Sequence, residues 1–462
     1  MNISSKSLPK LTNNTFRILS VGLLIFYVIN NLKNNIYEVL FIDERLLIDD
    51  IYNIWLIEDI YNRFSNISNQ SLKNILIIFI EFAYGGDLRY GRLWSNFFTI
   101  IAGPAIFISD TVVIILSRIL NSLLFFFGAY FLSRNLVDKK YCISCSSGTD
   151  ALLIPLMAYG IGPGDAVITT PFTYIATAEV IAILGATPIF IDIYEKTFNI
   201  DPDGIEEAVI FAKKQNLVPR AVIPVDLFGL PARYRLIDEV AKKYNLAVIE
   251  DFAQAFGSSI GVKKAGSFGN VSATSFYPAK PLGCYGDGGA IFTDDDDLAE
   301  KMKSIRVHGA GDNKYSNIRV GLNGRLDTIQ AAILLEKFKI FENELKSRNK
   351  IASYYKNNIN SNSVVPPFIP KNYTSSWAQF SVIAKNKNER KLIINRLSEQ
   401  KIPAAIFYDI PLHLQKVFKN LNYKKNSLPI SEKISNKIFS IPMHPYLNKD
   451  NQDKIIEVLN SQ

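Results

Sequence analysis

Apolar residues form long runs in the first 137 residues of the chain. The runs lie at Ile18–Ile29, Ile75–Ala83 and Phe97–Leu132. A membrane-spanning helix needs about 20 mostly apolar residues, and Thr111–Leu132 reaches that length if Arg118 is buried or extends to the membrane interface. We therefore expect residues 1–137 to form an α-helical, membrane-like segment. The alternative is the buried helical core of a soluble domain.

Charges around these runs predict an orientation. Basic residues precede the first apolar run and follow the last, and acidic residues lie between these runs. The basic residues are Lys6, Lys10, Arg17, Arg134, Lys139 and Lys140, and the acidic residues are Asp43, Glu44, Asp49, Asp50, Glu58 and Asp59. The positive-inside rule places both ends in the cytoplasm with an even number of crossings, and we expect two. The catalytic part would then be cytoplasmic and tethered to the inner (plasma) membrane by residues 1–137.

The segment Gly85–Phe98, with the acidic residues before it, weakly resembles the start of a polytopic membrane glycosyltransferase. In such enzymes an acidic residue of the first outer loop assists transfer. A solvated acidic loop is the alternative interpretation. A glycosyl-transfer component with an appended domain is accordingly one hypothesis for the whole chain.

The pattern changes after Asp138, where short β-rich runs alternate with helical periods. The β-rich runs read YCISC, DAVITT, TPIFIDI, RAVIPVDLF, LAVIED, VSATSFYP and GAIFTD. Such alternation predicts an α/β domain over residues 138–330, with a mostly parallel sheet between helices. A long helix from about Leu326 to Tyr355, a strand in WAQFSVIA and later helices predict a small α+β C-terminal domain over residues 331–462.

Composition narrows the function classes. Of the 462 residues, 48% are hydrophobic and 20% are charged, which excludes a disordered chain. The net charge of +8 is not gathered in a basic arm, so we expect no nucleic-acid partner. Three cysteines exclude a disulfide scaffold; Cys142 and Cys145 fall on a predicted strand and are expected to pack in the core. Asp294–Asp297 is typical of a solvated turn, so no metal site is predicted.

Three motifs carry candidate chemistry. Ser146-Ser147-Gly148-Thr149 follows a predicted strand and opens a helix, which makes it either an anion site or an ordinary N-cap. Asp251 ends a buried apolar strand, where α/β proteins bind ligands, although an N-cap aspartate would also fit. Lys280 lies in a Pro- and Gly-flanked loop, where a lowered pKa would let its amine form a Schiff base; a surface lysine is the alternative.

The order of these three motifs resembles the pyridoxal-phosphate (PLP) aminotransferases of fold type I. The amino-acid sequences of the motifs resemble those of the DegT/StrS family of sugar aminotransferases, from about residue 138 to residue 462. The motifs are SSGTDAL, GIGPGDAVITTPFTYIATAEV, VDLFG, IEDFAQAFG, SFYPAKPLGCYGDGGA, RVHG, GLNGRLDTIQAA, PLHLQ and IPMHP. This resemblance implies the PLP-transferase fold, with pyridoxal 5′-phosphate as the cofactor.

The resemblance also implies roles at the cofactor. Lys280 would hold the cofactor and move the proton, while Asp251 would pair with the ring nitrogen. Gln254 would lie near the phenolic oxygen of the ring, and Tyr174 would stack on the ring face. The cofactor phosphate would be held by Gly148, Thr149 and Ser275.

Further residues would bind the substrate or the second subunit. Asn323 would reach the phosphate of the neighbouring subunit's cofactor, which implies a homodimer with shared active sites. Arg325 would bind an anionic substrate group. His308 and His413 are candidate substrate contacts, with structural hydrogen bonding as the alternative.

The implied reaction transfers an amino group from glutamate to a nucleotide-linked keto sugar, for surface polysaccharide or glycan biosynthesis. In relatives several dozen residues precede the phosphate motif, and here the membrane-like segment stands in their place. We therefore expect a complete cofactor site and an incomplete sugar pocket. The alternative is a non-catalytic fusion remnant of an aminotransferase with a truncated membrane glycosyltransferase.

Overall fold

The computed structural model describes residues 137–313, 315–360 and 362–461. These residues belong to one compact unit, Tyr130–Gln462. The expected membrane-like segment lies outside the described residues, so its crossings and orientation stay predictions. Within the described part of the chain, no helix combines the length and apolarity that a membrane crossing requires.

A seven-stranded sheet forms the centre of the fold, in the order β1-β9-β8-β5-β4-β2-β3. Its strands are β1 (Tyr141–Cys145), β2 (Asp165–Thr169), β3 (Thr187–Phe190), β4 (Val218–Val222), β5 (Ala247–Asp251), β8 (Val271–Ser275) and β9 (Gly289–Thr293). Strand β9 pairs antiparallel with both of its neighbours, and all other pairings are parallel. The mostly parallel sheet predicted from the sequence is thereby confirmed.

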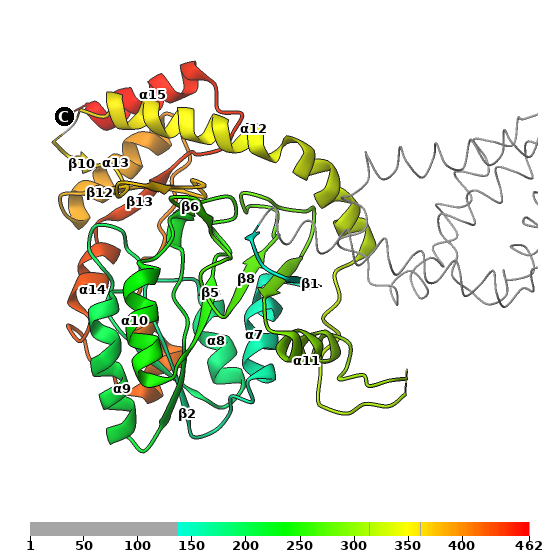
Figure 1. The fold of residues 1–462 in the computed structure, drawn as a ribbon. Coiled ribbons are helices and arrows are strands. Elements are labelled where there is room, and N and C mark those ends of the chain that lie inside the picture. Colours follow the sequence, from blue (N-terminus) through cyan, green and yellow to red (C-terminus); the bar gives the residue numbers. More distant parts are fainter. Residues whose placement is uncertain (1–136, 314, 361, 462) are drawn as a thin grey trace, which may run out of the picture. The chain divides into compact units, whose positions relative to one another are not determined.

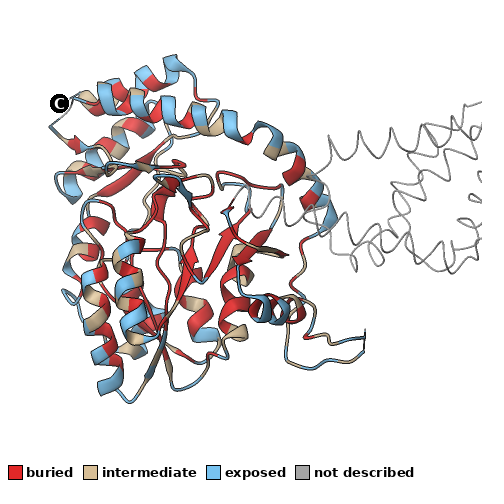
Figure 2. Ribbon diagram, viewed as in Figure 1, coloured by how far each residue is buried: buried red, intermediate tan, exposed pale blue. Residues whose placement is uncertain are grey.

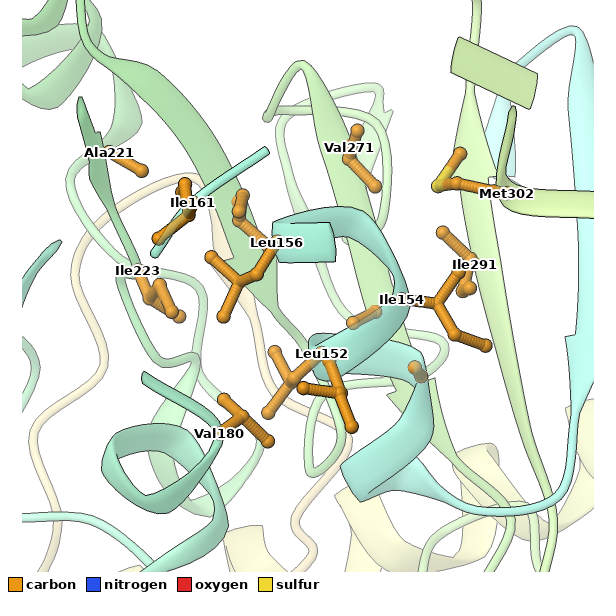
Figure 3. Packing of buried hydrophobic residues seen from close by; sticks show 14 of the residues in the cluster. Leu152, Ile154, Leu156, Ile161, Val180, Ala221, Ile223, Val271, Ile291 and Met302 are labelled. Carbon is orange, nitrogen blue, oxygen red and sulfur yellow. The ribbon is translucent and has the colours of Figure 1, made fainter. Parts of the chain in front are cut away.

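Helices cover both faces of this sheet (Figure 1). One face carries α7 (Gly148–Ala158), α8 (Ala176–Ile183) and α11 (Asp296–Arg306), and the other carries α9 (Ile205–Lys214) and α10 (Tyr234–Tyr244). Helix α7 buries Leu152, Ile154 and Leu156, and it packs against Ile291 of β9 and against Ile223, directly after β4 (Figure 3).

Alternation along the strands decides which face each residue takes. In β2, Val167 packs under α7 while Ala166 and Ile168 pack under α9 and α10. The same alternation in β5 sends Ile249 toward α7 and Val248 toward α10. Apart from the first three residues of β4, the strands are therefore largely buried on both sides, as Figure 2 shows. This explains why their sequences read as continuous apolar runs.

The C-terminal region is a second, smaller layer of helices on a sheet. Its elements are α12 (Thr328–Asn358), α13 (Lys387–Glu399), α15 (Lys449–Asn460) and a three-stranded sheet of β10 (Val364–Val365), β12 (Phe380–Ala384) and β13 (Ile438–Ile441). The expected α+β pattern is therefore present. The boundary predicted between residues 330 and 331 falls inside α12, so the division into two domains there stays a prediction.

One segment of the C-terminal region crosses to the large sheet. Ala405 pairs with Ser440, and residues 406–437 between them leave the small sheet and return; we call them the strap. The hydroxyl of Tyr423 accepts a hydrogen bond from the backbone N–H of Phe190 at 2.9 Å. Asp192 accepts the backbone N–H groups of Ile430 and Ser431, which begin α14 (Pro429–Ser435). The strap is thus fastened beyond β3, at the edge of the large sheet.

Candidate active site

Lys280 lies in the loop that follows β8, half-buried, and its backbone N–H donates to the carbonyl of Tyr277 at 2.9 Å. Burial lowers the pKa of the Lys280 amine, while the charge of Asp251 raises it. The carboxylate of Asp251 therefore acts electrostatically on the Lys280 amine. A lowered pKa increases the fraction of neutral amine, which is the nucleophilic form.

Asp251 ends β5 on the α8 side of the sheet and is only 5% exposed. Its carboxylate accepts the hydroxyl of Thr177 at 2.9 Å and the backbone N–H of Ala253 at 3.2 Å. Burial raises the pKa of this carboxyl, whereas the two hydrogen bonds and the charge of Lys280 lower it. A cation placed against Asp251 would offset the cost of burying its charge.

The N-terminus of α7 lies against Ser275. Ser147 caps the helix by accepting the backbone N–H of Asp150 at 3.0 Å, so the cap interpretation is confirmed for Ser147. The N–H groups of the first helical turn have no partner within a helix and point out of its end. A Cβ added at Gly148 would lie 2.5 Å from the Cβ of Ser275, so only glycine permits this approach. Helix N–H groups and the Ser275 hydroxyl together suit a phosphate.

Gln254 follows Asp251 and is held in one orientation. Its Oε1 accepts the backbone N–H of Phe228 at 2.6 Å, so its Nε2 faces the other way, toward the hydroxyl of Tyr408 at 3.4 Å. Tyr174 lies just before α8 and is 59% exposed. Burial raises the pKa of Tyr408, and the nearby Asp251 and Tyr174 raise it further.

The predicted substrate residues take different positions. The backbone N–H of Ser146 donates to the carbonyl of Gly324 at 3.0 Å, which sets exposed Asn323 and half-buried Arg325 beside the start of α7. His308 is exposed, and Val307 next to it pairs with Asn323. Roles for these side chains in substrate or subunit contact stay predictions.

His413 lies in the strap and is 2% exposed. Its Nε2 is 3.2 Å from a carboxylate oxygen of Glu432, and its Nδ1 is buried without a partner among the described residues. Burial lowers the pKa of His413, while Glu432 raises it. These contacts favour the structural alternative over contact with substrate, which stays a prediction.

Two residues of the site carry no sequence signal that singles them out. Thr177 falls within the motif FTYIATAEV, where a threonine in an apolar helix is the only hint of a buried hydrogen bond. Tyr408 lies 154 residues after Gln254 and reaches the site only because the strap does. Both cysteines lie on β1, as predicted. Cys145 is buried in the core, whereas Cys142 is half-buried, and burial raises the pKa of the Cys142 thiol to about 12.

The arrangement fits pyridoxal 5′-phosphate. The end of α7 and Ser275 suit its phosphate, the buried carboxylate of Asp251 suits its ring nitrogen, and the amine of Lys280 suits its aldehyde carbon. Fold and site together define a PLP-dependent enzyme of transferase fold type I.

Comparisons with known proteins then identify the family. Residues 132–460 match the DegT/DnrJ/EryC1/StrS aminotransferase family, and the chain belongs to it. It is 47% identical to a UDP-2-acetamido-2-deoxy-3-oxo-D-glucuronate aminotransferase of Pseudomonas aeruginosa, over 68% of this chain and 83% of that protein. A family member from Brucella abortus has a crystal structure with a TM-score of 0.68 and 46% identity, covering 71% of this chain and 87% of that one. An NtdA protein from Bacillus subtilis, solved with the cofactor PMP, gives a TM-score of 0.64 and 32% identity, covering 71% and 74%.

Proposed function

We propose that this protein is a PLP-dependent aminotransferase that moves an amino group from glutamate to a nucleotide-linked keto sugar. The observation that carries the proposal is the buried Asp251 carboxylate at the end of β5, held by Thr177 at 2.9 Å and acting electrostatically on the Lys280 amine, together with an α7 N-terminus that packs on Ser275 and suits a phosphate. A fusion remnant that had lost catalysis would have no need to retain these contacts together.

Each group of the site has a distinct task. Bound pyridoxal 5′-phosphate supplies an electron sink for the charge left when a proton leaves the carbon beside the substrate nitrogen. Asp251 would keep a positive charge on the ring nitrogen of the bound cofactor, and the hydrogen bond that Thr177 donates to Asp251 at 2.9 Å favours the ionised form of this carboxyl. The neutral amine of Lys280 takes the proton from the substrate carbon and returns it.

The sugar class is proposed from the relatives. The 47% identical protein is named for a UDP-linked 3-oxo glucuronate, and a 37% identical protein from Acidithiobacillus ferrooxidans for a UDP-linked 3-dehydro glucosamine. We propose a UDP-linked 3-keto sugar as the acceptor here, feeding surface polysaccharide or glycan synthesis. Half-buried Arg325, beside the start of α7, is the proposed contact for an anionic group of this substrate.

We also propose a homodimer in which Asn323 reaches the partner's cofactor phosphate. Exposed aromatic and apolar side chains support this: Tyr277, Tyr285, Ile318, Val320 and Ile329 are all more than half exposed in the single chain. A second subunit would cover such a surface. A cytoplasmic catalytic part, tethered to the inner membrane through residues 1–137, remains our proposal for the location.

The test uses the full chain loaded with pyridoxal 5′-phosphate. With glutamate alone, the wild-type enzyme should release about one equivalent of 2-oxoglutarate per site, and a UDP-linked 3-keto sugar should then turn the reaction over. Lys280→Ala should abolish both, with a loss of visible absorbance, because no other amine takes its place. Lys301→Ala, on the exposed face of α11, should behave as wild type. Full release of 2-oxoglutarate by Lys280→Ala, or none by wild type, would contradict the proposal.

A further inference from the structure

The hydroxyl of Tyr408 lies against a residue that the proposed function places at the cofactor ring. The side-chain oxygen of Gln254 accepts a hydrogen bond from the backbone N–H of Phe228 at 2.6 Å. Its Nε2 therefore has two N–H donors for the site side. One of them meets the hydroxyl of Tyr408 at 3.4 Å, which leaves the second for another acceptor.

Tyr408 stays protonated in this position. Burial raises its pKa, and the negative charge of Asp251 raises it further, while the hydrogen bond from Gln254 lowers it. A neutral hydroxyl accepts the amide N–H without adding a charge beside Asp251. The ring itself is fixed by Phe172, edge-on at a centroid distance of 6.0 Å.

Tyr408 comes from the strap, not from the large sheet that supplies Lys280, Asp251 and Gln254. The strap is fastened to the large sheet at points that do not involve the site, including the contact of Tyr423 with Phe190. Tyr408 is therefore a link between the C-terminal region and the amide of Gln254, separate from the fastening of the strap itself.

We propose that Tyr408 is a positioning residue that holds the Gln254 amide, so that its remaining N–H donates to the phenolic oxygen of the cofactor ring. This rests on the proposed function, because it requires that cofactor in the site. A donor to this oxygen stabilises the ionised form of the ring. Loosening the amide should therefore raise the pH at which the lysine-bound cofactor loses its proton.

Tyr408→Phe removes only the hydroxyl and retains the ring that packs on Phe172. The visible absorbance of the cofactor-loaded enzyme should titrate with a midpoint about 0.5 to 1 pH unit above wild type, as expected for one weakened hydrogen bond. Tyr423→Phe is the matched control, since it removes a hydroxyl of the same strap that contacts Phe190 instead. Its midpoint should equal that of the wild type. An unmoved midpoint in Tyr408→Phe, or equal shifts in both variants, overturns the proposal.

A second measurement needs no cofactor and separates the two proposals. In the cofactor-free protein, the melting temperatures of Tyr408→Phe, Gln254→Ala and the double variant form a mutant cycle. The contact predicts that the two single effects do not add. Additive effects overturn the role of Tyr408 even if wild type shows the Lys280-dependent absorbance. Non-additive effects, with no such absorbance in wild type, confirm the contact but overturn both the proposed function and the cofactor role of Tyr408.

Discussion

Thr177 provides the most direct test of how the site controls Asp251. Its hydroxyl has one proton, which it donates to Asp251 at 2.9 Å, so the 3.1 Å contact with Thr173 must be a donation from Thr173 to Thr177. Thr177→Val retains the shape of the side chain and removes that donor. The bond is buried at both ends, with Thr177 1% and Asp251 5% exposed.

The magnitude follows from the loss of one buried hydrogen bond to a charged acceptor. Such bonds contribute about 1.5–3 kcal/mol, and the lower part of that range applies because Asp251 retains the N–H of Ala253 at 3.2 Å. About 1.5–2 kcal/mol corresponds to an upward shift of about 1 to 1.5 units in the pKa of Asp251. The shift adds to the one that burial already causes in the same direction.

The assay is the dissociation constant of pyridoxal 5′-phosphate as a function of pH. Affinity should fall on the acid side as Asp251 takes up a proton, and this acid limb should move up by about 1 pH unit in Thr177→Val. Thr173→Val, which removes only the more distant donor, should move it much less. An acid limb that stays in place in Thr177→Val, or moves equally in both variants, would refute the reasoning.

The sign of the stability change in the cofactor-free protein also follows. The folded pKa of Asp251 lies above its unfolded value, so ionisation costs stability. The stability contributed by protonated Asp251 is fully present below the unfolded pKa of about 4, and it is lost as pH rises through the folded pKa. Thr177→Val should therefore lower the melting temperature more at pH 7 than near pH 4, where only the neutral hydrogen bonds of Thr177 are lost.

Two other variants test the surroundings of the site. Gly148→Ala would place a Cβ 2.5 Å from that of Ser275, so we expect a loss of about 1–3 kcal/mol in unfolding free energy and weaker cofactor binding. Gly162→Ala is the control, because the nearest neighbour of its added Cβ would be 3.8 Å away, and it should change neither property. Calorimetry and cofactor titration measure the two properties. Asp226 and Glu250 are both fully buried with raised pKa values, caused first by burial and, at Asp226, next by the charge of Glu250. Stability should thus fall as pH rises through their folded values, and Asp226→Asn should flatten that slope in melting temperatures from pH 5 to 9; an unchanged slope would contradict this.

Much of the fold could be predicted because it depends on local pattern. The runs YCISC and GAIFTD coincide with β1 and β9, since strands buried on both faces must be apolar throughout. The order of the site motifs could be predicted for a related reason: each lies at the end of a strand or in the loop that follows it, and the ends of parallel strands meet at one edge. Both signals are contained within about ten residues of sequence.

The strap could not be predicted in the same way. Tyr408 and Gln254 are 154 residues apart, and Asp192 and Ser431 are 239 apart. No period or spacing connects such pairs, because their contact depends on how the C-terminal region folds back across the sheet edge. Lys280 differs, because its loop directly follows a strand of the large sheet. The position of Lys280 relative to Asp251 therefore follows from the sheet topology alone.

Two adjacent carboxylates show why the structure, rather than the motif, separates a functional group from a structural one. Glu250 and Asp251 point to opposite faces of β5, as alternation requires. Glu250 accepts hydrogen bonds from Gly266, Phe268, Gly269 and Ser272, which occupy both of its oxygens within the protein. Asp251 has two donors and the more distant charge of Lys280. A buried carboxylate with this capacity left is suited to a cationic ligand, and Glu250 is not. The sequence IED contains both residues without distinguishing them, and only the environment of each face assigns the ligand to Asp251.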